Sequence, residues 1–251
     1  LEFLFKPDFS KLDTNSVLEA LGQAFFSLSI GMGTLITYGS YINKKQNLTS
    51  TAINVSAADT IIAILSGIAI FPAVFAFGIE PNAGPDLIFR TLPNIFQQMP
   101  GGYFFSLLFF ILLGVAALTS SISVLEVVVA YFVEELGILR KRATIIAAVS
   151  ITALGLLSTM SWGTLGDVEI FDFNIFGFLD FTASSVFLPI GGVFIVIFLG
   201  WYLGKKHILE EITSDGIYKA KLISVFVFIV KFLAPLAIAM VFLHGVGLLK
   251  F

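Results

Sequence analysis

Ser27 and Ser29 lie together with Gly31 and Gly33 in the middle of an apolar stretch. Each glycine weakens a helix by about 1 kcal/mol relative to alanine, and serine hydroxyls compete for backbone hydrogen bonds. A helix break here would free carbonyl and amide groups inside a membrane, where only protein or a water-filled cavity satisfies them. Breaks of this kind form the midplane substrate and ion sites of secondary transporters. The alternative is that these small residues only allow two helices to pack closely.

Two further groups of oxygen ligands lie in other apolar stretches. Asp59 is an ionisable residue at a position where a charge is unfavourable unless it is paired. It is therefore an ion ligand or a proton carrier, unless its carboxylate snorkels to the inner interface. Thr119, Ser120, Ser121 and Ser123 form a hydroxyl cluster, and oxygen ligands of this kind suit a hard cation such as Na⁺. Hydrogen bonds between helices, worth about 0.6 to 2 kcal/mol each, are the alternative for this cluster.

The composition excludes several other kinds of chemistry. The chain has no Cys and two His, so thiolate chemistry and a zinc-thiolate site are excluded. A net charge of -3 gives no indication of a nucleic-acid partner. Neither a phosphate-binding glycine loop nor a Ser/His/Asp set is present, so we expect no enzyme.

Long apolar stretches must position these residues. Of the 251 residues, 57% are hydrophobic and only 12% are charged, against about 25% charged in a soluble domain. A transmembrane helix needs about 20 apolar residues, and six stretches meet this length, the third continuing as helix to Glu135. They are Thr14 to Asn43, Thr49 to Gly78, Gly101 to Leu125, Ala143 to Trp162, Phe173 to Gly204 and Leu222 to Leu249.

The basic residues predict the orientation of these spans. The loops after the first, third and fifth spans hold nine of the 14 Lys and Arg residues, which places these loops in the cytoplasm and both ends of the chain outside. The first residue is not Met, and we expect an internal start, with a longer protein upstream of Leu1. The nine residues are Lys44, Lys45, Arg140, Lys141, Arg142, Lys205, Lys206, Lys219 and Lys221.

Some features have two interpretations. Asp180, near the outer end of the fifth span, is either an external gate charge or an interfacial residue. Lys231 is expected to snorkel. The segment from Glu80 to Pro100 is expected to form two short helices broken at Pro93, either as a lid over an outer vestibule or as an ordinary external loop. Kinks are expected at three prolines, Pro72, Pro189 and Pro235.

Four segments resemble one family in order along the chain. Ala20-Leu-Gly-Gln-Ala-Phe-Phe-Ser-Leu-Ser-Ile-Gly-Met-Gly-Thr resembles the sixth helix of the neurotransmitter:sodium symporter family. Ser66-Gly-Ile-Ala-Ile-Phe-Pro resembles its seventh helix, Ala116-Ala-Leu-Thr-Ser-Ser-Ile its eighth, and Leu179-Asp-Phe the start of its tenth. Within the family, the sequence is most similar to bacterial hydrophobic amino acid transporters of the MhsT type, which have eleven helices.

This resemblance implies an all-α integral membrane protein with the LeuT fold, which contains two inverted five-helix repeats. The chain would be one membrane domain over residues 1–251, comprising six transmembrane helices of which the first is broken. Residues 1–13 would form an external loop, 14–204 the second repeat, and 205–251 a cytoplasmic loop and the final helix. A missing N-terminal half with helices one to five would be its partner, in the lipid of a bacterial cell membrane.

The resemblance also implies a substrate site and two gates. Phe26 would be the aromatic lid, and Met32, which is flexible, would make the side-chain pocket broad enough for aliphatic and aromatic amino acids. The gating residues would be Phe26 and Asp180 outside and Tyr41 and Glu134 inside. The substrate-binding residues would be Phe26, Ser27, Ser29, Gly31, Met32, Ser120 and Val124.

Two Na⁺ sites follow from the same resemblance. Ser27 and Asp59 would hold the first ion, and Ala116 (through its carbonyl), Thr119 and Ser120 the second. Many relatives have Asn where Asp59 stands, and chloride-dependent members have a hydroxyl where Ala63 stands. The fixed carboxylate of Asp59 would take the place of chloride, so no chloride requirement is expected.

The leading hypothesis is Na⁺-coupled symport of hydrophobic L-amino acids by alternating access, with this chain as the C-terminal part of the transporter. The alternative is a non-transporting binding or sensor module of the same fold. An ion channel is disfavoured because no filter motif is repeated. We expect residues upstream of Leu1, on this or another chain, to be needed for transport.

Overall fold

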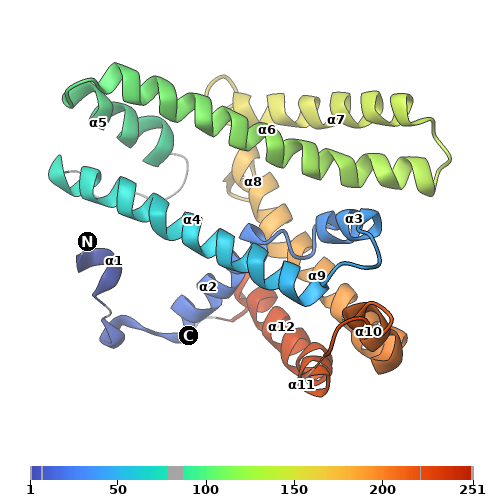
Figure 1. Cartoon of the computed structure of the whole chain (residues 1–251). Coiled ribbons are helices and arrows are strands. Elements are labelled where there is room, and N and C mark those ends of the chain that lie inside the picture. The colour runs from blue at the N-terminus through green and yellow to red at the C-terminus, as the bar shows by residue number, and fades with distance from the viewer. Residues whose placement is uncertain (1, 7, 79–86, 221, 250–251) are drawn as a thin grey trace. The chain divides into compact units, whose positions relative to one another are not determined.

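The computed structural model describes residues 2–6, 8–78, 87–220 and 222–249, which are mostly helical (Figure 1). Within these residues, five helical stretches have the length and apolar composition to cross a membrane. They are Leu48–Ala76 (α4), Gly102–Glu134 (α6), Arg140–Met160 (α7), Ile175–Thr213 and Ile223–Gly245.

The first predicted span is broken in its middle, as the sequence indicated. It consists of two short helices, α2 (Thr14–Ser27) and α3 (Thr34–Tyr41). Asp13 caps α2 by accepting a hydrogen bond from the Ser16 amide at 2.7 Å. Neither helix has the roughly 20 residues that a span requires, so the two must cross the membrane together.

The last two spans are helical throughout but contain wider, π-helical turns. Proline lacks an amide hydrogen and clashes with the carbonyl four residues earlier. Two of the π-helical turns end shortly before Pro189 and Pro235 and accommodate these prolines. The elements are α8 (Ile175–Phe181), η3 (Thr182–Phe187), α9 (Leu188–Ile197), η4 (Phe198–Leu203), α10 (Gly204–Thr213), α11 (Ile223–Phe228), η5 (Ile229–Leu233) and α12 (Ala234–Gly245).

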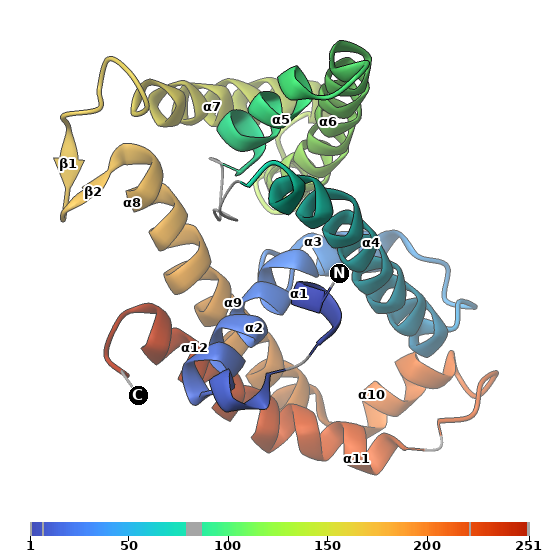
Figure 2. The ribbon, with the colours of Figure 1, turned by 90° about the vertical axis from the view of Figure 1, so that its left-hand side faces the viewer.

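Several expected loops contain secondary structure. The segment after residue 204 contains α10, which begins where Gly204 has a φ of 78° and turns the chain. The loop between the fourth and fifth spans contains a hairpin of β1 (Glu169–Ile170) and β2 (Phe173–Asn174), visible in Figure 2. The expected external loop over residues 1–13 contains α1 (Glu2–Phe5) and the 3-10 turn η1 (Phe9–Lys11).

Contacts divide the chain into two compact units. The first comprises Leu1–Lys11 and Asn54–Ile122, and the second comprises Leu12–Ile53 and Ser123–Phe251. The division cuts through the continuous helices α4 and α6, so the prediction of one membrane domain is not tested by it.

The core of the first unit includes residues of the segment expected to form a lid. Val74 of α4 packs with Leu92 and Ile95 of α5 (Leu92–Gln98). A π-helical turn, η2 (Leu87–Thr91), leads directly into α5. Pro93 lies in the first turn of α5 and therefore does not divide residues 87–98 into two helices. Residues 80–86 of that prediction lie outside the described residues.

The second unit contains the broken span, a cluster of buried residues and the packed helices of the last two spans. Val129 of α6 packs against Ala143 and Ala147 of α7. Helix α12 packs against both α9 and α2 (Figure 2). This packing fixes the first half of the broken span against the last two spans.

Candidate functional site

The break between α2 and α3 is fixed by residues with positive φ. Ser29, Gly31 and Gly33 have φ values of 54°, 89° and 82°. Glycine adopts this region without steric cost, whereas Ser29 is the single residue with a side chain to do so in the break. The Ile30 amide donates to the Phe25 carbonyl at 2.9 Å and closes the end of α2. The break is therefore a defined backbone structure and not a frayed helix end.

Gly31 and Gly191 allow the break to lie directly against the backbone of α9. A β-carbon at Gly31 would collide with the Leu188 carbonyl. A β-carbon at Gly191 would lie 2.5 Å from the Gly31 carbonyl oxygen. Packing thus requires glycine at both positions, whereas the part of Gly31 in substrate binding stays a prediction.

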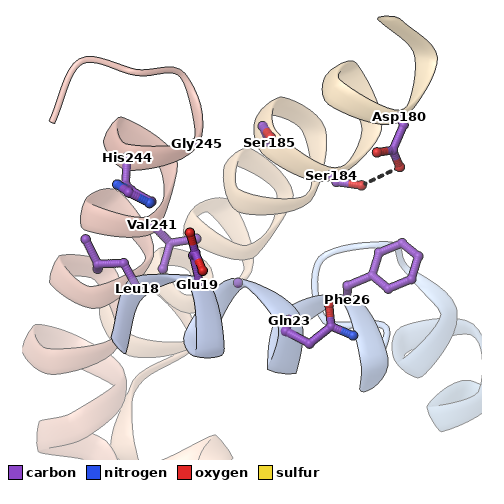
Figure 3. A pocket seen from close by; sticks show the side chains of 11 residues that line it. Leu18, Glu19, Gln23, Phe26, Asp180, Ser184, Ser185, Val241, His244 and Gly245 are labelled. Carbon is purple, nitrogen blue, oxygen red and sulfur yellow. Dashed lines mark hydrogen bonds between the residues drawn. The ribbon is translucent and has the colours of Figure 1, made fainter. Parts of the chain in front are cut away.

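Phe26 and Asp180, the two predicted outer-gate residues, line one pocket of about 420 Å³ (Figure 3). α2 forms one wall of this pocket, and α8, η3 and α12 form the rest. The Ser184 hydroxyl donates to an Asp180 carboxylate oxygen at 3.3 Å. The structure therefore places Phe26 and Asp180, which are 154 residues apart in the sequence, in one pocket, and their roles as lid and gate stay predictions.

Five polar residues of this pocket were not identified from the sequence, and two of them are Ser184 and Ser185 of η3. Glu19 and Gln23 line it from α2, and His244 lines it from α12. The spacing of Glu19, Gln23 and Phe26 places them on one face of α2, and this was an available signal. The position of His244 had no such signal, because it depends on how α12 packs against α2.

At the other end of the break, two tyrosines attach α3 to α6. The Tyr38 hydroxyl donates to Ser123 Oγ at 2.8 Å, and the Tyr41 hydroxyl donates to Glu126 Oε1 at 2.8 Å. Both donors and both acceptors are three residues apart, so each pair lies on one face of its helix. We refer to these four residues together with Arg140 as the inner clasp.

Arg140 completes the inner clasp from the start of α7. Its Nη2 donates to both oxygens of Glu126, at 2.8 and 2.7 Å. The Glu126 side chain is 17% exposed, whereas that of Arg140 is 62% exposed, so the pair lies where α6 meets solvent. Glu134, the predicted inner-gate acid, is exposed at the end of α6, and the hydrogen bond of Tyr41 goes to Glu126. The gating role of Glu134 stays a prediction.

The predicted Na⁺ ligands belong to both units. Asp59 lies on α4, and Ala116, Thr119 and Ser120 lie on α6, all in the first unit. The Thr119 hydroxyl donates to the Ala116 carbonyl at 2.8 Å. Both oxygens are of the neutral kind that a hard cation accepts as ligands. Ser27 belongs to the second unit, and its pairing with Asp59 stays a prediction.

The remaining predicted pocket residues are also divided between the two units. Ser29 and Met32 lie in the break and are half-buried. Ser120 and Val124 are one helical turn apart on α6, and both are exposed in this chain. Among the described residues, no group of three or more His, Cys, Asp or Glu residues could hold a metal ion.

Comparison with known proteins gives one consistent family. The model of the Sodium:neurotransmitter symporter family matches residues 1–250. The chain belongs to this family. The family consists of symporters and not of enzymes, and its multi-pass membrane architecture agrees with the apolar helices of this chain.

Relatives and a solved structure agree with this assignment. The chain is 37% identical over its whole length to the uncharacterized sodium-dependent transporter YhdH of Bacillus subtilis, covering 56% of it. It is 39% identical over 98% of its length to an uncharacterized sodium-dependent transporter of Haemophilus influenzae, covering 53% of it. The crystal structure of MhsT in complex with L-phenylalanine is 47% identical, with a TM-score of 0.86 over 97% of this chain and 55% of MhsT. The chain thus spans about half the length of the symporters it matches, and it has their all-α membrane fold.

Proposed function

We propose that this chain is the C-terminal part of a symporter that couples the uptake of hydrophobic L-amino acids to the Na⁺ gradient. The observation that carries this proposal is the break between α2 and α3, which is fixed by positive φ angles and seated against α9. Groups freed from a helix within the membrane need a partner. A substrate amino group and a cation are suitable partners for the freed carbonyls.

Two Na⁺ ions would bind through this chain. The first would use Ser27 and Asp59, and the second the Ala116 carbonyl, Thr119 and Ser120. The Thr119 hydroxyl oxygen and the Ala116 carbonyl oxygen would suit a hard monovalent cation as ligands. Both are neutral, and they lie 2.8 Å apart on one helix turn. Asp59 would supply the fixed negative charge near the substrate, so that chloride is not required.

The substrate would lie at the break. MhsT, a relative at 47% identity, has been crystallised with L-phenylalanine, which supports an amino acid substrate with an apolar side chain. Ser29, Met32, Ser120 and Val124 would line the side-chain pocket, with Gly31 contributing backbone. Phe26 would cover the substrate from the outer pocket.

Alternating access would open the two ends of the break in turn. The outer pocket contains Phe26 and Asp180, and the inner clasp attaches α3 to α6 and α7. Closing the outer end would bring Asp180 to a cation from the missing half, and opening the inner end would require the tyrosine hydrogen bonds of the clasp to break. Glu134 would contribute a second acid at that end.

The N-terminal half with helices one to five would complete each site. This half and the surrounding lipid of a bacterial cell membrane are the partners we propose, with the loops rich in lysine and arginine in the cytoplasm. Without that half, transport is not expected.

Uptake of radiolabelled leucine and tryptophan tests this proposal. Proteoliposomes would contain the chain with its N-terminal half restored, under inward Na⁺ or K⁺ gradients without chloride. We expect uptake with Na⁺ alone, and its loss in Asp59→Ala and in Thr119→Ala. Ser121→Ala is the matched control, because the Ser121 hydroxyl bonds to the Ala117 carbonyl of its own helix and is not a proposed ligand.

The other outcomes distinguish the alternatives. Folded protein that binds amino acid but takes up none in either salt would favour a binding or sensor module. Uptake that does not depend on Na⁺ would overturn both ion sites and leave the fold unaffected.

A further inference from the structure

An apolar groove of about 620 Å³ lies between the first turns of α4 and the start of α11. Ala52 and Ile53 form one wall, and Leu222 and Phe226 form the other. Ile53 is 63% exposed and Leu222 is 70% exposed, so both side chains are open to a ligand. All of these residues belong to the second unit.

The mouth of this groove is basic. Lys219 is the single charged residue among the described residues that line it, and its side chain is exposed. Lys44 and Lys45 lie four and three residues before Leu48, which also lines the groove. The acid Glu211 does not line the groove; it lines an adjoining polar cavity together with Lys44, and Leu48 lines both.

Hydrogen bonds hold the two basic loops together at this mouth. The Tyr218 hydroxyl donates to the Lys45 carbonyl at 3.1 Å, and the Ser214 hydroxyl donates to the Gln46 carbonyl at 2.7 Å. Ser214 is buried, which makes this connection part of the packed structure. The loop before α4, with Lys44 and Lys45, and the loop before α11, with Lys219, are therefore held together beside the apolar groove.

We infer that the groove is a binding site for an anionic phospholipid. The acyl chains would lie along Ala52, Ile53 and Phe226, and the phosphate would meet Lys219 and the loop of Lys44 and Lys45. Basic pockets between transmembrane helices on the cytoplasmic side bind anionic head groups in this way. These loops are among those that the distribution of basic residues places in the cytoplasm. The site lies beyond the proposed transport function and does not depend on it.

The charge of the mouth determines which lipid the site prefers. A zwitterionic lipid offers the same acyl chains but also a cation, which the lysines would repel. An anionic lipid such as phosphatidylglycerol pairs its phosphate with the lysine ammonium groups while its acyl chains fill the groove. We therefore expect phosphatidylglycerol to bind more tightly than phosphatidylcholine with identical chains.

Native mass spectrometry of the complete transporter, with its N-terminal half present, tests the inference. The purified protein is titrated with phosphatidylglycerol and, separately, with phosphatidylcholine. Lys219→Gln should weaken phosphatidylglycerol binding about fivefold, the effect of one lysine near a head group, and should leave phosphatidylcholine unchanged. Ala52→Trp fills the groove and should weaken the binding of both lipids.

Two matched variants serve as controls. Lys141→Gln removes one basic residue from another loop, and Val149→Trp adds the same indole to the exposed surface of α7. Equal weakening by Lys141→Gln and Lys219→Gln would overturn the inference in favour of general attraction between charges. Unchanged lipid binding in Ala52→Trp would also overturn it and would indicate that the N-terminal half covers the groove. Because Lys219 is exposed in a loop, Lys219→Gln should fold normally, so weaker lipid binding by this variant cannot be attributed to misfolding.

Discussion

The first and the fifth spans both depart from a regular α-helix near mid-length, but they do so in different ways. In the first, α-helix stops at Ser27 and resumes at Thr34, with three positive φ angles between them. In the fifth, the chain stays helical through the π-helical turns η3 and η4. The Leu188 amide at the end of η3 still donates to the Ala183 carbonyl, five residues earlier.

This difference distinguishes the proposed binding element from a span that supports it. A π-helical turn widens a helix but keeps its backbone groups paired, so it adapts the fifth span to Pro189 without exposing polar atoms. The break in the first span releases backbone groups that a ligand can use. It also leaves α3 with eight residues, too few for independent stability, so α3 depends on the inner clasp.

The largest effect is expected from Gly31→Ala. A side chain at a φ of 89° is strained by about 1–3 kcal/mol, and its β-carbon would also collide with the Leu188 carbonyl. We expect Na⁺-driven uptake to fall about tenfold or more. Gly39→Ala is the control, because no atom lies within 4 Å of its added β-carbon, and it should leave uptake intact. Equal loss of uptake in both variants would contradict a special role for the break.

A smaller effect is expected from Glu126→Gln in the inner clasp. The substitution removes the charge that pairs with Arg140 and weakens the bond from Tyr41. Because the Arg140 side chain is 62% exposed, we expect a loss of about 1 kcal/mol, which frees α3 to move. Labelling of Ser40→Cys, in a chain that has no other cysteine, should become about fivefold faster.

Glu134→Gln, measured in the same labelling experiment, distinguishes the two acids that could hold α3. If Glu126 is the acid that holds α3, Glu134→Gln should leave the labelling rate at Ser40→Cys unchanged. A larger increase with Glu134→Gln than with Glu126→Gln would instead assign the inner gate to Glu134, as the family resemblance implies.

Pro189→Ala tests the fifth span and should have little effect on transport. The buried ring of Pro189 loses packing worth about 1–2 kcal/mol, which should lower the thermal unfolding midpoint of the purified protein. Uptake measured at a temperature where the protein is folded should stay within about twofold. A loss as large as that of Gly31→Ala would show that the π-helical turns take part in binding and would remove the contrast between the two spans.

The smallest effect is expected at Asp13, which caps the first half of the broken span. Hydrogen bonds from the Ser16 hydroxyl and amide lower the pKa of Asp13. The folded pKa lies below the ordinary value of about 3.9, so the stabilisation is present above that pH and is lost as the pH falls through the lowered value. Asp13→Asn should therefore slightly reduce the pH dependence of the unfolding midpoint below about pH 4. An unchanged dependence would show that the cap does not contribute.

The sequence alone predicts the features that local chemistry determines. The break follows from Ser27, Ser29, Gly31 and Gly33, since these residue types disfavour a helix whatever surrounds them. The spans follow from length and hydropathy. The helical elements that were missed are α1 and η1 in the expected external loop, α10, which is amphipathic and charged, and the π-helical turns, which no composition distinguishes from α-helix.

The inner clasp could not be predicted because it depends on tertiary packing. Glu126 is an ionisable residue in an apolar helix, which is a signal for function, but its partners lie on two other elements. The matching separation of Tyr38 from Tyr41 and of Ser123 from Glu126 becomes informative only when α3 is known to lie along α6. The outer pocket shows the same limit, since His244 meets α2 only through the packing of α12.

The contact between Gly31 and α9 has a consequence for biosynthesis. Gly191 follows Gly31 by 160 residues, so at about 5–20 residues per second the ribosome makes this partner about 8–32 s later. During that interval nothing from α9 holds the break, and the stretch from Thr14 to Tyr41 enters the bilayer without the contact that shapes it. The break follows from its own residues, but its packing against α9 is therefore acquired only when the fifth span arrives, and translation order delays this step until most of the chain has been made.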